Sequence, residues 1–206
     1  MFVGAVRGEG VSTVSREFAR LAAVRATKPV WLIDADLHRQ GQQQIMMQAP
    51  DRFGRAGETV AGSPDGSSFY SIKPPLIDPE GERVRPARLL TAKSFLGRRL
   101  YATRFLHEQL KAGQNAQSLK QGDYWVALSQ HVDAVIVDVP SLDRDETALM
   151  LAPFMDDIVI VVGENADIDP PLKLKEQLLS VGGRVSGVVI NRSTYKPPKL
   201  IKKLMG

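Results

Sequence analysis

The start of the chain constrains the fold most, because it combines a short apolar run, a glycine-rich turn and two hydroxyl residues. Phe2–Val6 has the composition of a buried strand, Gly8 and Gly10 follow it, and Ser12 and Thr13 begin a predicted helix. A turn of this kind directs backbone N–H groups and the positive end of the helix toward one point, where phosphate groups bind. A glycine turn that only caps a helix has the same pattern, so this segment alone leaves both interpretations open.

The position that usually holds a lysine in a phosphate-binding loop is occupied by Val11. The usual loop ends in Gly-Lys-Ser/Thr, where the lysine contacts the β and γ phosphates and the hydroxyl contacts Mg²⁺. Here the sequence is Gly10-Val11-Ser12, so the hydroxyl is present and the lysine is absent. By analogy with removing an oxyanion-hole donor, losing one preorganised cation costs roughly 3–4 kcal/mol of transition-state stabilisation. We therefore expect any phosphoryl transfer to be slow.

Two further apolar segments end in carboxylates. Val30–Asp34 is followed closely by Asp36, and Ala134–Asp138 ends in the same way. Because ligands in a parallel sheet bind beyond the carboxyl ends of the strands, we expect Asp34, Asp36 and Asp138 to face the glycine turn. Carboxylates at this edge suit Mg²⁺ and an activated hydroxyl or water. Each aspartate taken singly could also end a strand or cap a helix.

The order of the apolar segments predicts the fold class. Strands are predicted over 2–6, 30–34, 134–138, 157–163 and 185–190, and helices near 12–26, 99–112, 124–132 and 171–181. Buried strands separated by helices indicate an α/β protein with a doubly wound, mostly parallel sheet flanked by helices. We expect a single domain over residues 1–206, with a basic C-terminal tail at 193–206. We also expect an irregular surface loop over 50–81, where 14 of 32 residues are Gly, Pro or Ser.

Composition narrows the function classes. The chain lacks cysteine, which excludes disulfides and thiolate metal sites, and its three histidines have no ligand-like spacing. No apolar run reaches the ~18 residues of a membrane span and no leader is recognised at Met1, so we expect a cytoplasmic protein. The formal net charge is only +4. Aromatic residues in the basic stretch 83–111 have the spacing of a helix core, so we expect no nucleic-acid partner.

Four segments together resemble the motifs of a known family, the bacterial tyrosine kinases. The Walker A, Walker A′, Walker B and base-side motifs of these kinases are similar to Gly8–Thr13, Leu32–Arg39, Val135–Ser141 and Gly187–Arg192. The kinases are cytoplasmic autokinase domains of the deviant Walker A class, with the P-loop NTPase fold. They are attached to, or encoded beside, the chain-length regulators of capsule and exopolysaccharide export. Residues 40–121 have no recognisable counterpart.

The resemblance implies a role for each matching residue. Asp34 would activate the acceptor hydroxyl or orient water, and the catalytic carboxylates would be Asp34, Asp36 and Asp138. Ser12, Asp36 and Asp138 would hold Mg²⁺. The contacts implied for ATP or ADP are Arg7, Gly8, Glu9, Gly10, Val11, Ser12 and Thr13 in the loop, and Asn191 and Arg192 near the adenine.

The chain also departs from the family pattern. Besides Val11, Val6 stands where the partition ATPases have their signature lysine, and His38-Arg39 replaces an arginine pair. The C-terminal tyrosine cluster, which is the autophosphorylation substrate in the family, is reduced to Tyr195. These departures predict a degenerate, pseudokinase-like domain in which ATP, ADP and Mg²⁺ bind weakly or not at all.

Three functions remain open at this point. The first is a regulatory P-loop protein that contacts a membrane-bound polysaccharide chain-length or export protein and is able to form a homo-oligomer. The second is an active autokinase in which Arg7 or Arg39 replaces the lysine and Tyr195 is phosphorylated. The third is a partition-type ATPase, which Val6 disfavours. The basic, apolar tail Lys196–Met205 either touches the inner face of the plasma membrane or is solvated, and its short length favours the second.

Overall fold

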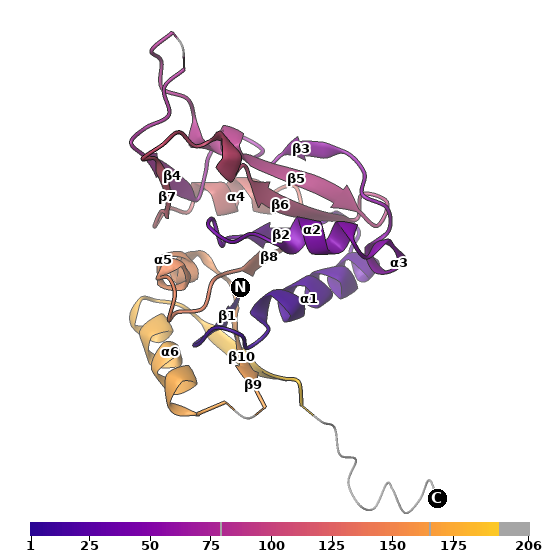
Figure 1. Cartoon of the computed structure of the whole chain (residues 1–206). Helices are drawn as coiled ribbons and strands as arrows, with labels where there is room; N and C mark the ends of the chain where they lie inside the picture. The colour runs from indigo at the N-terminus through magenta and orange to yellow at the C-terminus, as the bar shows by residue number, and fades with distance from the viewer. Residues whose placement is uncertain (79, 165, 194–206) are drawn as a thin grey trace, which may run out of the picture.

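An eight-stranded sheet forms the centre of the protein. The computed structural model describes residues 1–193 except 79 and 165. The strands of the sheet are β1 Phe2–Gly4, β2 Val30–Asp34, β3 Thr59–Ala61, β5 Leu90–Phe95, β6 Leu100–Phe105, β8 Ala134–Asp138, β9 Ile158–Gly163 and β10 Val185–Asn191. Their order is β10-β9-β1-β8-β2-β6-β5-β3; the first six run parallel, β5 pairs antiparallel with β6, and β3 pairs antiparallel with β5 (Figure 1). The predicted mostly parallel α/β sheet is confirmed.

Helices cover both faces of this sheet (Figure 1). The first layer contains α1 Val11–Arg25, α2 Gln42–Met47 and α3 Pro50–Phe53, and the second contains α4 Asp123–Ser129, α5 Thr147–Leu151 and α6 Asp169–Ser180. The remaining elements are the antiparallel pair β4 Tyr70–Lys73 and β7 Asn115–Ser118 and the short 3-10 helices η1 Pro86–Leu89, η2 His107–Gln109 and η3 Ala152–Phe154. One hydrophobic core lies under each helix layer.

Helix α1 reaches the sheet through small residues. Val11, Ser15, Ala19 and Ala23 recur every four residues along one buried face of the helix. This spacing follows the helical repeat, and the small side chains allow α1 to lie close to β1, β2 and β8. The first turn of α1 is thereby held just beyond the carboxyl end of β1.

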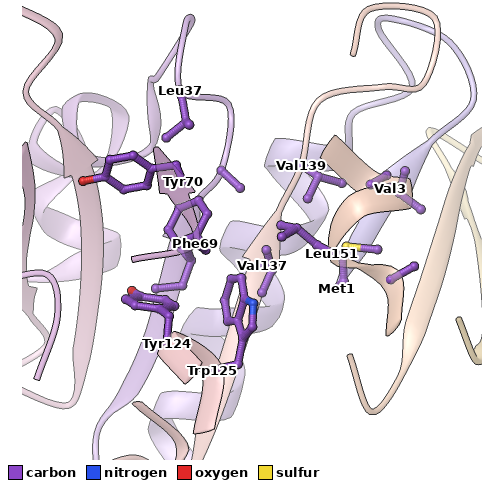
Figure 2. Packing of buried hydrophobic residues seen from close by; sticks show 14 of the residues in the cluster. Met1, Val3, Leu37, Phe69, Tyr70, Tyr124, Trp125, Val137, Val139 and Leu151 are labelled. Atoms are coloured by element: carbon purple, nitrogen blue, oxygen red, sulfur yellow. The ribbon is translucent and has the colours of Figure 1, made fainter. Parts of the chain in front are cut away.

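A group of aromatic side chains lies in the core under α4, α5 and α6 (Figure 2). Phe69 lies 5.2 Å from Tyr70, 5.1 Å from Tyr124 and 5.3 Å from Trp125, measured between ring centroids. Figure 2 shows the Trp125 ring next to Val137 of β8. Aromatic rings in such offset or edge-on arrangements stabilise a core beyond their buried area. The segment around Phe69 is therefore part of the folded core.

Two predictions about the middle of the chain were wrong. Residues 50–81 contain α3, β3 and β4, and Phe53, Phe69, Tyr70 and Ile72 are buried, so this segment is not simply an irregular surface loop. The helix expected near 99–112 is replaced by strand β6 and the short η2. Pairing with β2 on one side and β5 on the other overrides the helix-like spacing of Tyr101 and Phe105.

The other predicted elements are present to within a few residues. Within the part of the chain that the structure describes, no helix is long and apolar enough to cross a membrane. Most of the predicted tail, including Tyr195, lies outside the described residues, because only Ser193 of that segment is described.

Candidate functional site

The loop between β1 and α1 has a backbone that requires glycine. Gly8 and Gly10 have φ angles of +94° and +87°, in the left-handed region that side chains disfavour. A Cβ atom on Gly10 would lie 2.0 Å from Nδ2 of Asn191. That amide donates a hydrogen bond of 2.8 Å to the carbonyl oxygen of Glu9. The end of β10 therefore holds the loop in place.

The N-terminus of α1 opens toward solvent beside this loop. Ser12 and Thr13 are exposed in the first turn, which contains no acidic residue and no side-chain cap. The Glu9 side chain is instead buried, and its Oε2 accepts a hydrogen bond of 3.1 Å from the Val6 backbone N–H. The unpaired N–H groups and the dipole of a 15-residue helix make this end attractive to anions.

The three strand ends meet at one pocket of about 330 Å³. Ser12, Asp34 and Asp138 all line it, as the sequence predicted. The lining also contains most other predicted site residues, namely Arg7, Gly8, Glu9, Gly10, Val11, Thr13, Asp36 and Arg192. Asn191 acts on the loop backbone from behind. The predicted convergence on a common pocket is therefore present in the structure.

Asp34 and Asp138 lie side by side at the bottom of the pocket. They are register partners on β2 and β8, and each side chain is buried. Asp34 Oδ2 accepts the backbone N–H groups of Gly41 at 3.1 Å and Gln42 at 3.2 Å. Burial, followed by the charge of Asp138, raises the pKa of Asp34 well above its usual range.

The pKa of Asp138 is also raised, again mainly by burial, but hydrogen bonds from Gln42, Ser12 and Ser15 oppose this shift. Two buried carboxylates this close cannot both ionise easily. The upward shift of the pKa is larger for Asp34, because the charge of Asp138 adds to its burial, so Asp34 is the member that keeps a proton near neutral pH. In that form it accepts no further proton from a reacting hydroxyl.

Asp36 is engaged by other groups of the chain. Its Oδ2 receives a hydrogen bond of 2.7 Å from Nη2 of Arg144, and its Oδ1 accepts the backbone N–H of Arg39 at 2.9 Å. Asp36 thus fixes the turn after β2 and links it to the segment after β8. Within the described residues, no group of three or more His, Asp and Glu side chains is arranged to hold a metal ion.

Val11 borders the pocket, and its side chain packs in the core. Its side chain is 8% exposed and belongs to the cluster that also contains Phe2 and Ala19. Among the described residues, the cations that line the pocket are five arginines and no lysine: Arg7, Arg16, Arg39, Arg144 and Arg192. Arg7, Arg39 and Arg192 are exposed, whereas Arg16 is buried under the pocket. The positive charge therefore lies mostly around the rim.

Gln42 and Arg16 are pocket residues that the sequence did not single out. Gln42 Nε2 donates to Asp138 Oδ2 at 2.6 Å, and Arg16 Nη1 donates to Gln42 Oε1 at 3.0 Å. Gln42 belongs to a run of glutamines, and nothing in that run distinguishes the one that faces the pocket. Arg16 follows the helical pattern of α1 as an ordinary polar position. Only the fold brings the two together.

Comparisons with known proteins show similarity at the level of structure. No family model and no curated protein sequence matches the chain. The kinase domain of VpsO is 20% identical and covers 94% of this chain and 84% of its own, with a TM-score of 0.57. The kinase domain of the Escherichia coli tyrosine kinase ETK is 16% identical over 96% of this chain and 70% of its own, with a TM-score of 0.54.

A third solved structure is the nucleotide-binding protein from Archaeoglobus fulgidus in complex with ADP. It is 15% identical and covers 96% of this chain and 67% of its own, with a TM-score of 0.53. At such identities the similarity establishes the architecture and leaves the chemistry to the site residues. The chain has the α/β fold of the VpsO and ETK kinase domains.

Proposed function

We propose that this chain is a kinase-like nucleotide-binding domain with weak or absent ATP turnover. In this proposal it regulates exopolysaccharide or capsule biosynthesis or export together with a membrane-bound chain-length protein. The observation that carries the proposal is the glycine loop at the start of α1, which faces Asp34 and Asp138 while Val11 is buried in the core.

Binding of ATP or ADP is supported by the shape and the donors of the pocket. Gly8, Gly10, Ser12 and Thr13 would contact the phosphates, because their backbone lies at the positive end of α1. Arg192 lines the pocket and would lie near the base, while Asn191 positions the loop. The fold shared with an ADP complex agrees with this assignment.

Slow turnover is supported by two features of the site. The buried valine leaves no lysine for the β and γ phosphates, a loss expected to reduce the rate by about 10²–10³. Asp34 holds a proton near neutral pH, because burial raises its pKa, and is a poor base in that form. Magnesium fits the site poorly, since Asp36 is paired with Arg144 and Asp138 with Gln42, so we assign no step to a metal.

An active autokinase is the second candidate, and the exposed arginines favour it. Arg7 and Arg39 line the pocket, and guanidinium groups bind phosphate well. If either supplied the missing charge, the purified chain would contain phosphotyrosine. Mass spectrometry of the intact protein after expression distinguishes this candidate from the first.

Calorimetric titration with Mg-ATP and ADP, combined with an ATPase assay, tests the proposal. We expect nucleotide binding with turnover near background, and higher turnover in Val11→Lys, because lysine at a helix start can extend toward the phosphates. Val126→Lys is the matched control, since it adds the same charge at an exposed position outside the pocket. Rapid turnover by the unmodified chain contradicts the regulatory function, and failure to bind any nucleotide contradicts the site itself.

The biological role is tested separately. Deleting the chain should alter the length or amount of exported polysaccharide, and a variant that cannot bind nucleotide should show whether the site is required. Unchanged polysaccharide in the deletion strain would contradict the proposed biological role but not the proposed nucleotide site.

A further inference from the structure

The buried amide of Gln42 lines the pocket and connects its acidic and basic groups. Its Nε2 donates to Asp138 Oδ2 at 2.6 Å, to the Ser12 carbonyl oxygen at 2.9 Å and to Ser15 Oγ at 3.3 Å. Its Oε1 accepts from Nη1 of Arg16 at 3.0 Å. A carboxylate and a carbonyl only accept and a guanidinium only donates, so this set of partners fixes which way the amide points.

The Gln42 amide occupies a carboxylate oxygen that a bound cation would need as a ligand. Mg²⁺ in nucleotide sites is typically bound by one or two carboxylates together with substrate phosphates and water. Here Asp138, which the side chain of Ser12 in the phosphate loop reaches, already holds an N–H donor at Oδ2. Displacing that donor would break a hydrogen bond to a charged group and leave buried Arg16 without its acceptor.

The other carboxylate atoms offer little in its place. Asp36 is paired with Arg144, and Asp34 Oδ2 accepts two backbone N–H groups. The second oxygen of Asp138, Oδ1, has no hydrogen-bond partner, but it is buried. A hydrated Mg²⁺ therefore does not reach it in this arrangement.

Positive charge for the phosphates is available from the protein instead. The exposed side chains of Arg7, Arg39 and Arg192 line the rim of the same pocket, where guanidinium groups can pair with phosphate oxygens. We propose that the pocket binds nucleotide phosphates without a divalent cation, with the Gln42 amide in the place of the metal and the rim arginines neutralising the phosphates. This inference rests on the proposed nucleotide site and specifies how that site works.

Titration calorimetry with ADP, in EDTA and in excess Mg²⁺, tests the inference on the full chain. For the unmodified protein we expect Kd values that agree within about twofold, or weaker binding with Mg²⁺. Gln42→Ala frees Asp138, so Mg²⁺ should then tighten ADP binding by about tenfold, the size expected for a hydrogen bond to a charged group. Arg39→Ala should weaken binding equally in both buffers.

Gln43→Ala is the matched control, because Gln43 is the next residue of α2, is also buried and bonds Ala102 of β6 outside the pocket. Its Kd values in the two buffers should agree as closely as those of the unmodified protein, because the bond that it loses is to β6 and not to Asp138. If the unmodified chain binds ADP about tenfold more tightly in Mg²⁺ than in EDTA, the inference is wrong, but the nucleotide site still stands. Absence of ADP binding in both buffers overturns the proposed function itself. The comparison of buffers on the unmodified protein decides the matter even if Gln42→Ala does not fold.

Discussion

The two halves of the molecule contribute to the site in different ways. The parallel half, β10, β9, β1, β8 and β2, carries the loop and the carboxylates at its strand ends. The extension, residues 50–121, contributes no described residue to the pocket lining. Yet the extension contacts the residues behind the pocket, because the Asp34 backbone N–H donates to Thr103 Oγ1 of β6 at 2.9 Å.

The extension also holds the segment that carries Gln42. Gln40 Oε1 accepts the Phe105 backbone N–H at 2.6 Å, and Gln43 Nε2 donates to the Ala102 carbonyl at 2.7 Å. The parallel half thus supplies the groups that face a ligand, and the extension supplies their rigidity. A site of this kind needs such second contacts to keep its groups in position.

The largest expected effect comes from removing an aromatic ring of the extension. Phe69→Ala should lower the free energy of unfolding by about 3–5 kcal/mol, because it leaves a cavity among buried aromatic side chains. Urea denaturation measures this change. Val126→Ala, on the exposed surface of α4, should change stability by less than about 0.5 kcal/mol. A Phe69→Ala protein as stable as the Val126→Ala protein would show that the extension is not part of the core.

The next effect lies in the parallel half and depends on pH. Because burial raises the pKa of Asp34 above its unfolded value of 3.8, the unfolded chain loses this proton first. The contribution of Asp34 to stability therefore falls as pH rises above about 4. Asp34→Asn removes this loss and should stabilise the protein by on the order of 2 kcal/mol at neutral pH, with little difference near pH 4.

Unfolding curves of both proteins at several pH values check this prediction. Asp51→Asn, at an exposed position of α3, is the control and should give no pH-dependent difference. Parallel stability profiles for Asp34→Asn and the unmodified protein would contradict the buried, protonated carboxyl.

The smallest effect tests the contact between the two halves. Thr103→Val keeps the shape of the side chain but removes the acceptor of the buried Asp34 N–H, which should cost about 1 kcal/mol of stability and weaken ADP binding. Thr91→Val on β5, where the hydroxyl lies on the exposed side, should leave ADP binding unchanged. Equal ADP affinities for the two variants would show that the extension does not influence the site.

The sequence predicts the parallel half better than the extension, for physical reasons. Strands such as β2 and β8 are buried on both faces, so their apolar runs are continuous and end at a polar residue. Strand β6 has Tyr101 and Phe105 four residues apart, a helix-like spacing, and only its pairing with β2 and β5 selects the extended form. The glycine and proline residues of 50–81 likewise indicate turns but do not reveal the buried Phe69 between them.

Prediction of the site from the sequence is limited in the same way. The glycine loop and the aspartates at the strand ends follow from local patterns, and the pocket brings them together. The bonds of Gln42 with Asp138 and Arg16 join residues far apart in the chain. No local pattern encodes such a network.

The central claim is that nucleotide phosphates bind at the start of α1. Titrating ¹⁵N-labelled protein with ADP and following its backbone amides by NMR tests this claim most directly. The account predicts that the amides of Gly8, Gly10, Ser12 and Thr13 shift progressively while those of β3 and β5 stay in place. Unchanged loop amides at saturating ADP, or shifts confined to the extension, would contradict it.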